Sequence, residues 1–83
     1  MKLLHFTAEW CNPCKMMQPI IEDIISERSD IEYVSIDIDK KVSVALEYEI
    51  MSIPFFILEH EDGSVVKVQG AMAKRQFLDA LGL

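Results

Sequence analysis

Two cysteines separated by two residues, Cys11 and Cys14, constrain the fold of this chain more than any other feature. They follow a short apolar run, Lys2–Thr7, that is typical of a strand, and they open a stretch with helical periodicity. At the start of a helix, residues i and i+3 lie on the same face, so the two side chains can reach each other. A disulfide needs Cα atoms about 4.4–6.8 Å apart, which one helical turn allows. The spacing therefore predicts a redox-active dithiol at a helix N-terminus.

The expected place of Cys11, at or just before the first helical residue, favours its thiolate form. Unpaired backbone N–H groups and the positive end of the helix dipole stabilise an anion there. Because the thiolate is the nucleophile of disulfide exchange, we expect Cys11 to attack a substrate and the more buried Cys14 to resolve the mixed disulfide. Pro13 suits the first turn, where its missing N–H has no helical partner. Asn12 adds no charge, which favours a reducing dithiol over a strong oxidant.

A structural disulfide and half of a zinc site are the alternatives to a redox dithiol. A disulfide that closes so small a loop stabilises little, because its entropy term grows with loop size. Zinc needs four ligands, and only His5 and His60 remain as further candidates of the usual kind. We therefore expect no metal, and no cofactor besides the Cys11–Cys14 disulfide itself.

Composition places further limits on the function. A chain of 83 residues with 51% hydrophobic residues suffices for one small domain, which we expect to span residues 1–83. The net charge of −6 disfavours nucleic acids and anionic membranes, because phosphates require Lys and Arg. The longest apolar stretch, Ile53–Leu58, is too short to span a bilayer, and no signal cleavage site precedes the dithiol. Without an export signal we expect a cytoplasmic protein, and in such a reducing compartment cysteines are more often catalytic than structural. We also expect a monomer.

Hydrophobic periodicity predicts an α/β fold with the element order βαβαββα. The predicted strands are Lys2–Thr7, Ile31–Asp37, Phe55–Leu58 and Val65–Gln69, and the predicted helices are Cys11–Arg28, Lys40–Tyr48 and Lys74–Leu81. Asp39 is expected to cap the second helix, Glu61–Ser64 to form a hairpin turn, and Met16 and Met17 to fill the core. The first two strands should be parallel and the hairpin antiparallel, which gives a four-stranded mixed sheet with helices on both faces.

The chain resembles the thioredoxin family over essentially all of its length. The resemblance rests on four segments in register: Ala8–Lys15, Ile36–Asp39, Ile53-Pro54 and Gly70-Ala71. It implies the thioredoxin fold and a thiol–disulfide oxidoreductase that reduces protein disulfides through a mixed-disulfide intermediate. It also implies disulfide-containing proteins as substrates and a thioredoxin reductase, or an equivalent electron donor, as the partner that regenerates the dithiol.

The resemblance also implies roles for residues outside the dithiol. Pro54 is similar to the family's cis-proline, which lies against the dithiol, and peptide groups beside it are expected to pair with a substrate backbone. The residues expected to bind an extended substrate segment are Trp10, Asn12, Pro13, Ile53, Pro54, Gly70 and Ala71.

Three positions or segments depart from the family pattern. The usual strand and helix ahead of the dithiol strand are absent, so Ile31–Asp37 is expected to form a sheet edge. His5 stands where most thioredoxins have a buried Asp, and Ser35 where a Lys commonly neighbours that Asp. A neutral imidazole at position 5 is either a proton acceptor for Cys14 or a hydrogen-bonded core residue. Asn12 replaces the usual Gly between the cysteines.

Two other functions remain open at this point. A glutaredoxin-like, glutathione-dependent reductase would match the chain length, but the cysteine motif and the negative charge disfavour it, because glutathione carboxylates require basic partners. A non-enzymatic binding subunit would use the same rim around the dithiol without redox chemistry.

Overall fold

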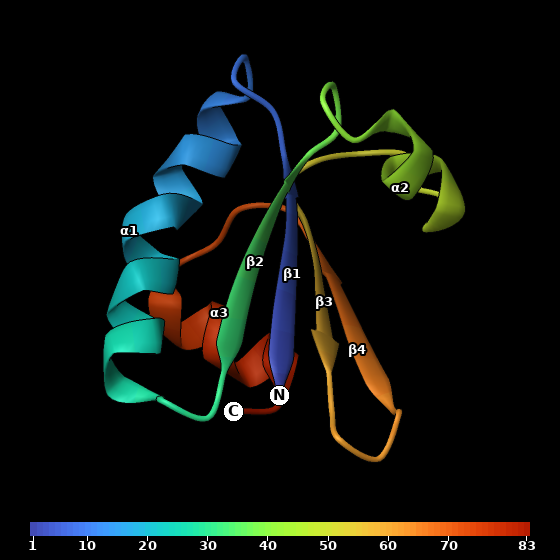
Figure 1. The fold of residues 1–83 in the computed structure, drawn as a ribbon. Coiled ribbons are helices and arrows are strands. Elements are labelled where there is room, and N and C mark those ends of the chain that lie inside the picture. Colours follow the sequence, from blue (N-terminus) through green and yellow to red (C-terminus); the bar gives the residue numbers. More distant parts are fainter.

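The computed structural model describes residues 1–83 and contains seven elements in the predicted order (Figure 1). The strands are β1 (Lys2–Thr7), β2 (Glu32–Asp37), β3 (Phe55–Glu59) and β4 (Val65–Gln69), and the helices are α1 (Asn12–Glu27), α2 (Val42–Glu47) and α3 (Lys74–Leu81). β1, β4 and α3 have the predicted bounds, β2 and β3 differ by one residue at one end, and α1 is one residue shorter at each end. α2 is shorter than predicted at both ends.

The four strands form one mixed sheet in the order β2-β1-β3-β4. β1 is parallel to β2 and antiparallel to β3, and β3 is antiparallel to β4. This confirms the predicted mixed sheet and places β2 at its edge, as expected. In this register His5 of β1 lies between Ser35 of β2 and Phe56 of β3.

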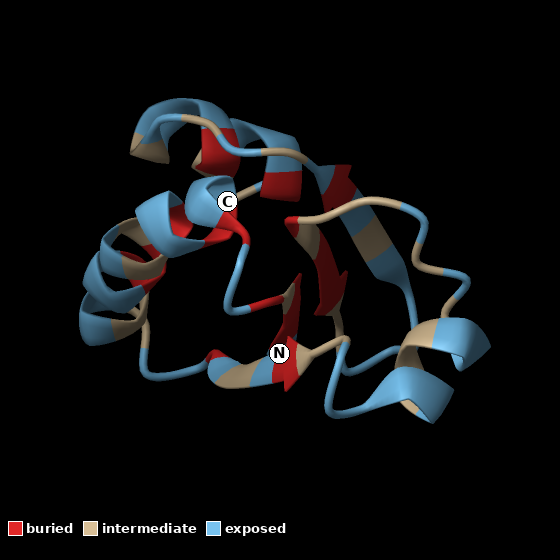
Figure 2. Cartoon of the chain, turned by 90° about the horizontal axis from the view of Figure 1, so that it is seen from above, coloured by how far each residue is buried: buried red, intermediate tan, exposed pale blue.

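α1 and α3 cover one face of the sheet and enclose the larger part of the core (Figures 1 and 2). The buried residues of this cluster are Leu3, Met17, Ile21, Ile24, Ile31, Phe56, Leu58, Val68, Phe77 and Leu81. α1 contributes a stripe that begins at Cys14 and repeats every three or four residues, as an amphipathic helix requires. Met17 belongs to this stripe and is 1% exposed, whereas the neighbouring Met16 is 67% exposed. The core-filling prediction is therefore wrong for Met16, because one residue turns the helix by about 100°.

α2 covers the opposite face, which confirms that helices lie on both sides of the sheet. Strand alternation sends Leu4 and Phe6 of β1 to this face, where they join Ile36 and Ile57 in a second, smaller cluster. α2 has six residues, none of them buried (Figure 2). None of the three helices has the length and apolar character needed to cross a membrane.

The connection between β2 and α2 differs from the prediction. Asp39 does not cap α2: the N-cap is Lys41, whose side chain makes no capping hydrogen bond. Instead the Asp37 carboxylate at the end of β2 accepts hydrogen bonds from the backbone N–H groups of Asp39 and Lys40, at 2.8 and 3.3 Å. This turn delays the start of the helix and leaves the Asp39 side chain free for another contact. The predicted hairpin turn is confirmed, with Gly63 at a φ of 91°.

Candidate active site

Cys11 and Cys14 form a disulfide across the first turn of α1. Cys11 is the N-cap residue, with an extended backbone, and Cys14 lies one turn inside the helix. Their Cα atoms are 5.3 Å apart, within the range that a disulfide requires. The backbone N–H of Cys14 donates to Cys11 Sγ at 3.2 Å. The predicted position of the dithiol at a helix N-terminus is therefore confirmed.

The two cysteines lie in an apolar cluster at the start of α1. Cys11 is 4% exposed and Cys14 is 1% exposed, so the second cysteine is the more buried one, as expected. Both belong to a small cluster with Ala8, against which Ile38 and Ile53 lie. The first turn of α1 contains no acidic side chain. The positive end of the helix dipole and the N–H of Cys14 therefore act on Cys11 Sγ without an opposing negative charge nearby in the turn.

The loop before the dithiol is tied to the connection between β2 and α2. Trp10 Nε1–H donates to the Asp39 carboxylate at 2.7 Å, and Lys40 forms an ion pair with Glu9 at 3.1 Å. Trp10 is nevertheless 65% exposed, so its ring is available to a bound molecule. Exposed ion pairs such as Lys40–Glu9 contribute little free energy. The indole hydrogen bond is therefore the contact that orients the ring beside Cys11.

Pro54 lies at the start of β3, and the Ile53–Pro54 peptide bond is cis, as the resemblance predicts. Pro54 is buried, and its carbonyl oxygen accepts a hydrogen bond from the N–H of Gly70 at 2.9 Å. This bond continues the β3–β4 ladder beyond its last paired residues. The structure thus brings Pro54 and Gly70 together, although they are far apart in the sequence.

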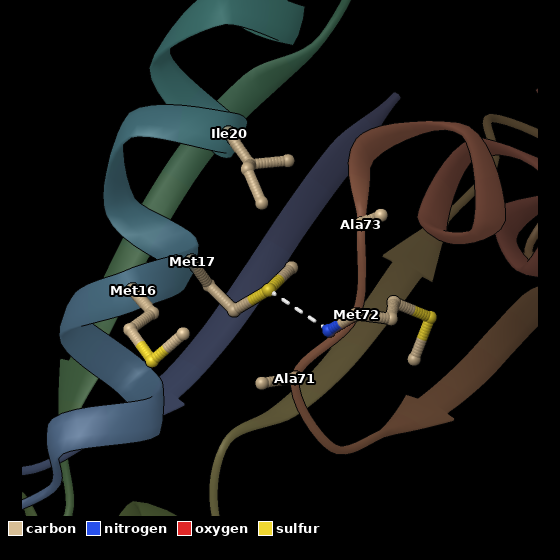
Figure 3. A pocket seen from close by; sticks show the side chains of 6 residues that line it. All are labelled: Met16, Met17, Ile20, Ala71, Met72 and Ala73. Carbon is tan, nitrogen blue, oxygen red and sulfur yellow. Dashed lines mark hydrogen bonds between the residues drawn. The ribbon is translucent and has the colours of Figure 1, made fainter.

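Three of the seven predicted rim residues, Trp10, Ile53 and Ala71, line two apolar hollows, whereas Pro54 and Gly70 line neither. One hollow of about 260 Å³ is lined by Trp10, Ile38, Ile50, Met51, Ser52 and Ile53. The other, of about 280 Å³, is lined by Met16, Met17, Ile20, Ala71, Met72 and Ala73 (Figure 3). We call these the Trp10 hollow and the Met72 hollow. Asn12 and Pro13 are exposed in the first turn of α1 and line neither.

The sequence did not predict that methionine side chains, those of Met16, Met17 and Met72, line part of the site. Figure 3 shows Met16, Met17 and Ile20 of α1 facing the segment Ala71–Ala73, with the N–H of Met72 donating to Met17 Sδ at 3.4 Å. The available signal was the position of Met16, one residue outside the buried stripe of α1. A flexible thioether on an exposed helix face suits adaptable apolar contacts.

His5 is fully buried on the face of β1 that α1 covers. Its Nδ1 lies 2.9 Å from the Tyr33 hydroxyl, and its ring stacks on Phe56 with centroids 4.6 Å apart. Nε2 has no hydrogen-bond partner, and no hydrogen bond joins His5 to either sulfur of the disulfide. Burial lowers the pKa of His5 from 6.5 to about 4, because the charged form is poorly solvated there. The imidazole is therefore neutral near pH 7.

Tyr33 was not foreseen as a partner of His5. Its hydroxyl also lies 3.4 Å from Gln18 Oε1, and burial raises the pKa of the phenol. The signal was the parallel register: residue 33 of β2 points to the same face as residue 35, which pairs with His5. His60, the other histidine, lies at the β3–β4 hairpin, and no group of three or more His, Cys, Asp or Glu side chains is placed to hold a metal ion.

Comparisons with known proteins agree with this geometry. The thioredoxin family model matches residues 1–82. The chain is 35% identical to a thioredoxin of Mycolicibacterium smegmatis, covering 95% of this chain and 77% of that protein. It is 37% identical to a thioredoxin of Staphylococcus epidermidis, covering 96% and 78%.

A solved structure extends the agreement to three dimensions. The oxidised form of mitochondrial thioredoxin 3 from Saccharomyces cerevisiae superposes with a TM-score of 0.84 at 33% identity, covering 98% of this chain and 76% of that one. The fold, the dithiol at the helix N-terminus and these relatives together show that the chain belongs to the thioredoxin family of thiol–disulfide oxidoreductases.

Proposed function

We propose that this oxidoreductase reduces protein disulfides with Cys11 as the attacking thiol and Cys14 as the resolving thiol. The observation that carries the assignment is the Cys14 N–H donated to Cys11 Sγ at the N-cap of α1. The same donor, together with the helix dipole, would stabilise a negative charge on Cys11 in the reduced form. No comparable donor reaches the Cys14 sulfur, so the two cysteines are not equivalent.

The proposed reaction transfers two electrons in two exchange steps. The Cys11 thiolate attacks one sulfur of a substrate disulfide, that S–S bond breaks, and the departing substrate thiolate takes up a proton. Cys14 then loses its proton and attacks Cys11 Sγ, which forms the Cys11–Cys14 disulfide and releases the second substrate thiolate. A thioredoxin reductase, or an equivalent donor, returns two electrons and two protons to the dithiol.

His5 is the group we propose to accept the Cys14 proton. It lies on the sheet face beneath α1, the helix that carries Cys14 in its first turn and packs Met17, Ile21 and Ile24 on that face. Nε2 is buried and without a partner in the disulfide form. Because the lowered pKa keeps the imidazole neutral, Nε2 can receive a proton at physiological pH.

The two hollows are proposed to hold apolar side chains of the substrate on either side of the scissile disulfide. Trp10 and Ile53 line one and Ala71 lines the other, and the peptide groups next to Pro54 are proposed to supply the backbone partners. An extended segment would add to this backbone as a strand does. All six residues lining the Met72 hollow are hydrophobic, which suits a protein substrate better than the carboxylates of glutathione. The cytoplasm remains the expected location.

Insulin reduction driven by dithiothreitol tests the cysteine assignment. We expect Cys11→Ser to abolish catalysis, because no nucleophile remains at the helix N-terminus. Cys14→Ser is the matched control: it should still attack but accumulate a mixed disulfide, which mass spectrometry detects. A Cys11→Ser variant as active as the wild type would refute the assignment. Turnover supported by glutathione and glutathione reductase alone would instead favour the glutaredoxin-like function.

Stopped-flow fluorescence tests the role of His5. Trp10 is the only tryptophan and precedes Cys11, so its emission reports each exchange step. We expect His5→Ala to slow resolution of the mixed disulfide by about 100-fold, the lower range for a positioned proton acceptor, without slowing the first attack. An unchanged pH–rate profile for resolution would remove His5 from the mechanism.

A further inference from the structure

We propose that Tyr33, Gln18 and Glu22 form a positioning chain that holds His5 in the tautomer with the proton on Nδ1 and a bare Nε2. The proposal rests on the function proposed above, because it concerns the nitrogen that would receive the Cys14 proton. None of the three residues touches the sulfurs, so each would act only through the imidazole.

The positioning chain begins at the surface of α1. Gln18 and Glu22 are one helical turn apart, and Gln18 Nε2–H donates to the Glu22 carboxylate at 3.3 Å. A carboxylate only accepts, so this contact fixes which end of the amide is nitrogen. The Gln18 oxygen consequently faces Tyr33, whose hydroxyl donates to it at 3.4 Å.

The hydroxyl of Tyr33 then sets the proton position on His5. A phenol has one proton. In the hydrogen bonds of the structure Tyr33 gives it to Gln18, with Ser35 as a further neighbour of the phenol, so the Tyr33 oxygen acts as an acceptor toward His5 Nδ1, 2.9 Å away. Nδ1 must therefore carry the imidazole proton. In a neutral ring the second nitrogen is then unprotonated, since the hydrogen bond of one nitrogen determines the state of the other.

This assignment explains an otherwise costly feature, the buried Nε2 without a partner. A disulfide sulfur has no proton to donate, so the oxidised protein offers Nε2 nothing. In the dithiol form Cys14 carries an S–H, and a bare Nε2 is the acceptor that suits it. The opposite tautomer would place an N–H there, which could not take up a proton.

No hydrogen bond in the chain has to reverse when the proton moves. Cys14 Sγ–H gives its proton to Nε2, and the resulting thiolate attacks Cys11 Sγ, which breaks the mixed disulfide and releases the substrate thiolate. Nδ1–H continues to donate to Tyr33. His5 is faced by the stacked ring of Phe56 of β3 and by Tyr33 of β2, and its register partner on β2 is Ser35. Gln18 of α1 reaches it only through Tyr33.

Nitrogen-15 NMR of the full chain, in both oxidised and reduced forms, tests the tautomer without reference to activity. We expect His5 of the wild type near pH 7 to show a protonated Nδ1 and a bare Nε2. Tyr33→Phe should shift the equilibrium toward the Nε2–H tautomer. Tyr48→Phe is the matched control, because the other tyrosine packs on Phe6 at the opposite face of the sheet. A protonated Nε2 in the wild type would overturn the proposal.

The kinetic test separates positioning from a purely structural role. We expect Tyr33→Phe to slow resolution of the mixed disulfide about tenfold, the rate equivalent of one hydrogen bond, and to leave the attack by Cys11 unchanged. Gln18→Ala, at a helix position that tolerates alanine, should slow it less. A changed tautomer with an unchanged resolution rate in both variants would overturn the proposal, while loss of insulin reduction from the wild type itself would instead overturn the proposed function.

Discussion

The two faces of the sheet differ in how many residues they bury. We call the face under α1 and α3 the deep face and the face under α2 the shallow face. Under α1 and α3 lies a cluster of ten buried residues, whereas α2 covers a cluster of four. α1 has 16 residues and places four of them in the interior, while α2 has six and buries none. Figure 2 shows the contrast, with buried positions on the inward sides of α1 and α3 and none on α2.

The difference shows how one strand can serve two environments. β1 sends His5 to the deep face and Phe6 to the shallow one, although they are adjacent. Burial against Phe56 and Tyr33 on the face under α1 and α3 disfavours the imidazolium and keeps His5 neutral. The shallow face instead borders the Trp10 hollow, where Ile38 and Ile53 are partly exposed. The deep face is thus suited to proton chemistry and the shallow one to reversible contact.

The largest expected effect comes from opposing aromatic residues of β3. Phe56 is fully buried on the deep face between His5 and Phe77, with ring centroids 4.6 Å from each. Phe56→Ala should lower the free energy of unfolding by about 3–5 kcal/mol, because it removes a buried ring and leaves a cavity. Phe55→Ala, one residue away on the shallow face, should lower it by about 1–2 kcal/mol.

Urea denaturation of the oxidised variants, followed by circular dichroism, measures both values. Phe56→Leu replaces the alanine variant if the latter does not fold. Equal losses at positions 55 and 56 would show that the two faces are packed equally well and would remove the basis of the comparison.

A smaller effect should appear in the acid dependence of stability. The unfolded chain binds a proton at His5 below about pH 6.5 and the folded chain only below about pH 4. Between these values the unfolded state holds more protons, so the free energy of unfolding falls as the pH is lowered, by up to about 3 kcal/mol. We expect His5→Leu to lose this component and His60→Gln, at the hairpin, to retain it.

The test is to measure the urea midpoints of the wild type, His5→Leu and His60→Gln from pH 7 to pH 4 and to compare how the free energy of unfolding changes with pH. Carboxylates also titrate over this interval, and the difference between the wild type and His5→Leu cancels their contribution. Parallel curves for these two proteins would mean that the deep face does not disfavour the imidazolium.

The smallest expected effect concerns the helix N-termini on the two faces. Ala73, the N-cap of α3, has the extended backbone of a capping residue but no side-chain acceptor. Ala73→Ser should raise the free energy of unfolding by about 0.5–1 kcal/mol. Lys41→Ser, at the uncapped start of the shorter α2, should raise the free energy of unfolding by less, because no residue of α2 is buried. Thermal unfolding compares the two, and a larger gain at position 41 would contradict the view that α2 contributes little to stability.

Most of the fold was predictable from the sequence because its signals were local and mutually consistent. The apolar run of β1, the helical periodicity of α1 and the turn at Gly63 each specify an element without reference to the rest of the chain. The start of α2 was not predictable in this way. Two aspartates, Asp37 and Asp39, compete to make the turn, and only the register of β2 decides that the first does so.

The site also has a part that local sequence specifies and a part that depends on contacts between distant segments. The dithiol positions follow from a four-residue motif, Cys11 to Cys14, and a helix start, which are local. The partners of His5 do not, because Tyr33 and Gln18 meet it only after β1 and β2 pair in parallel and α1 crosses over them. The Met72 hollow likewise depends on how the segment before α3 meets α1. Contacts between distant segments require the assembled fold.

The edge position of β2 has a consequence for handling the protein in acid. One side of this strand leaves backbone donors and acceptors without a neighbouring strand, which can template the addition of another chain. Glu32 is exposed on it, and the chain carries 14 acidic residues against 8 Lys and Arg, so mutual repulsion keeps copies apart at neutral pH. Acidification removes that repulsion over the interval in which the fold also weakens. Light scattering there should reveal sheet-to-sheet aggregation that Glu32→Lys, by placing a cation on the edge, suppresses.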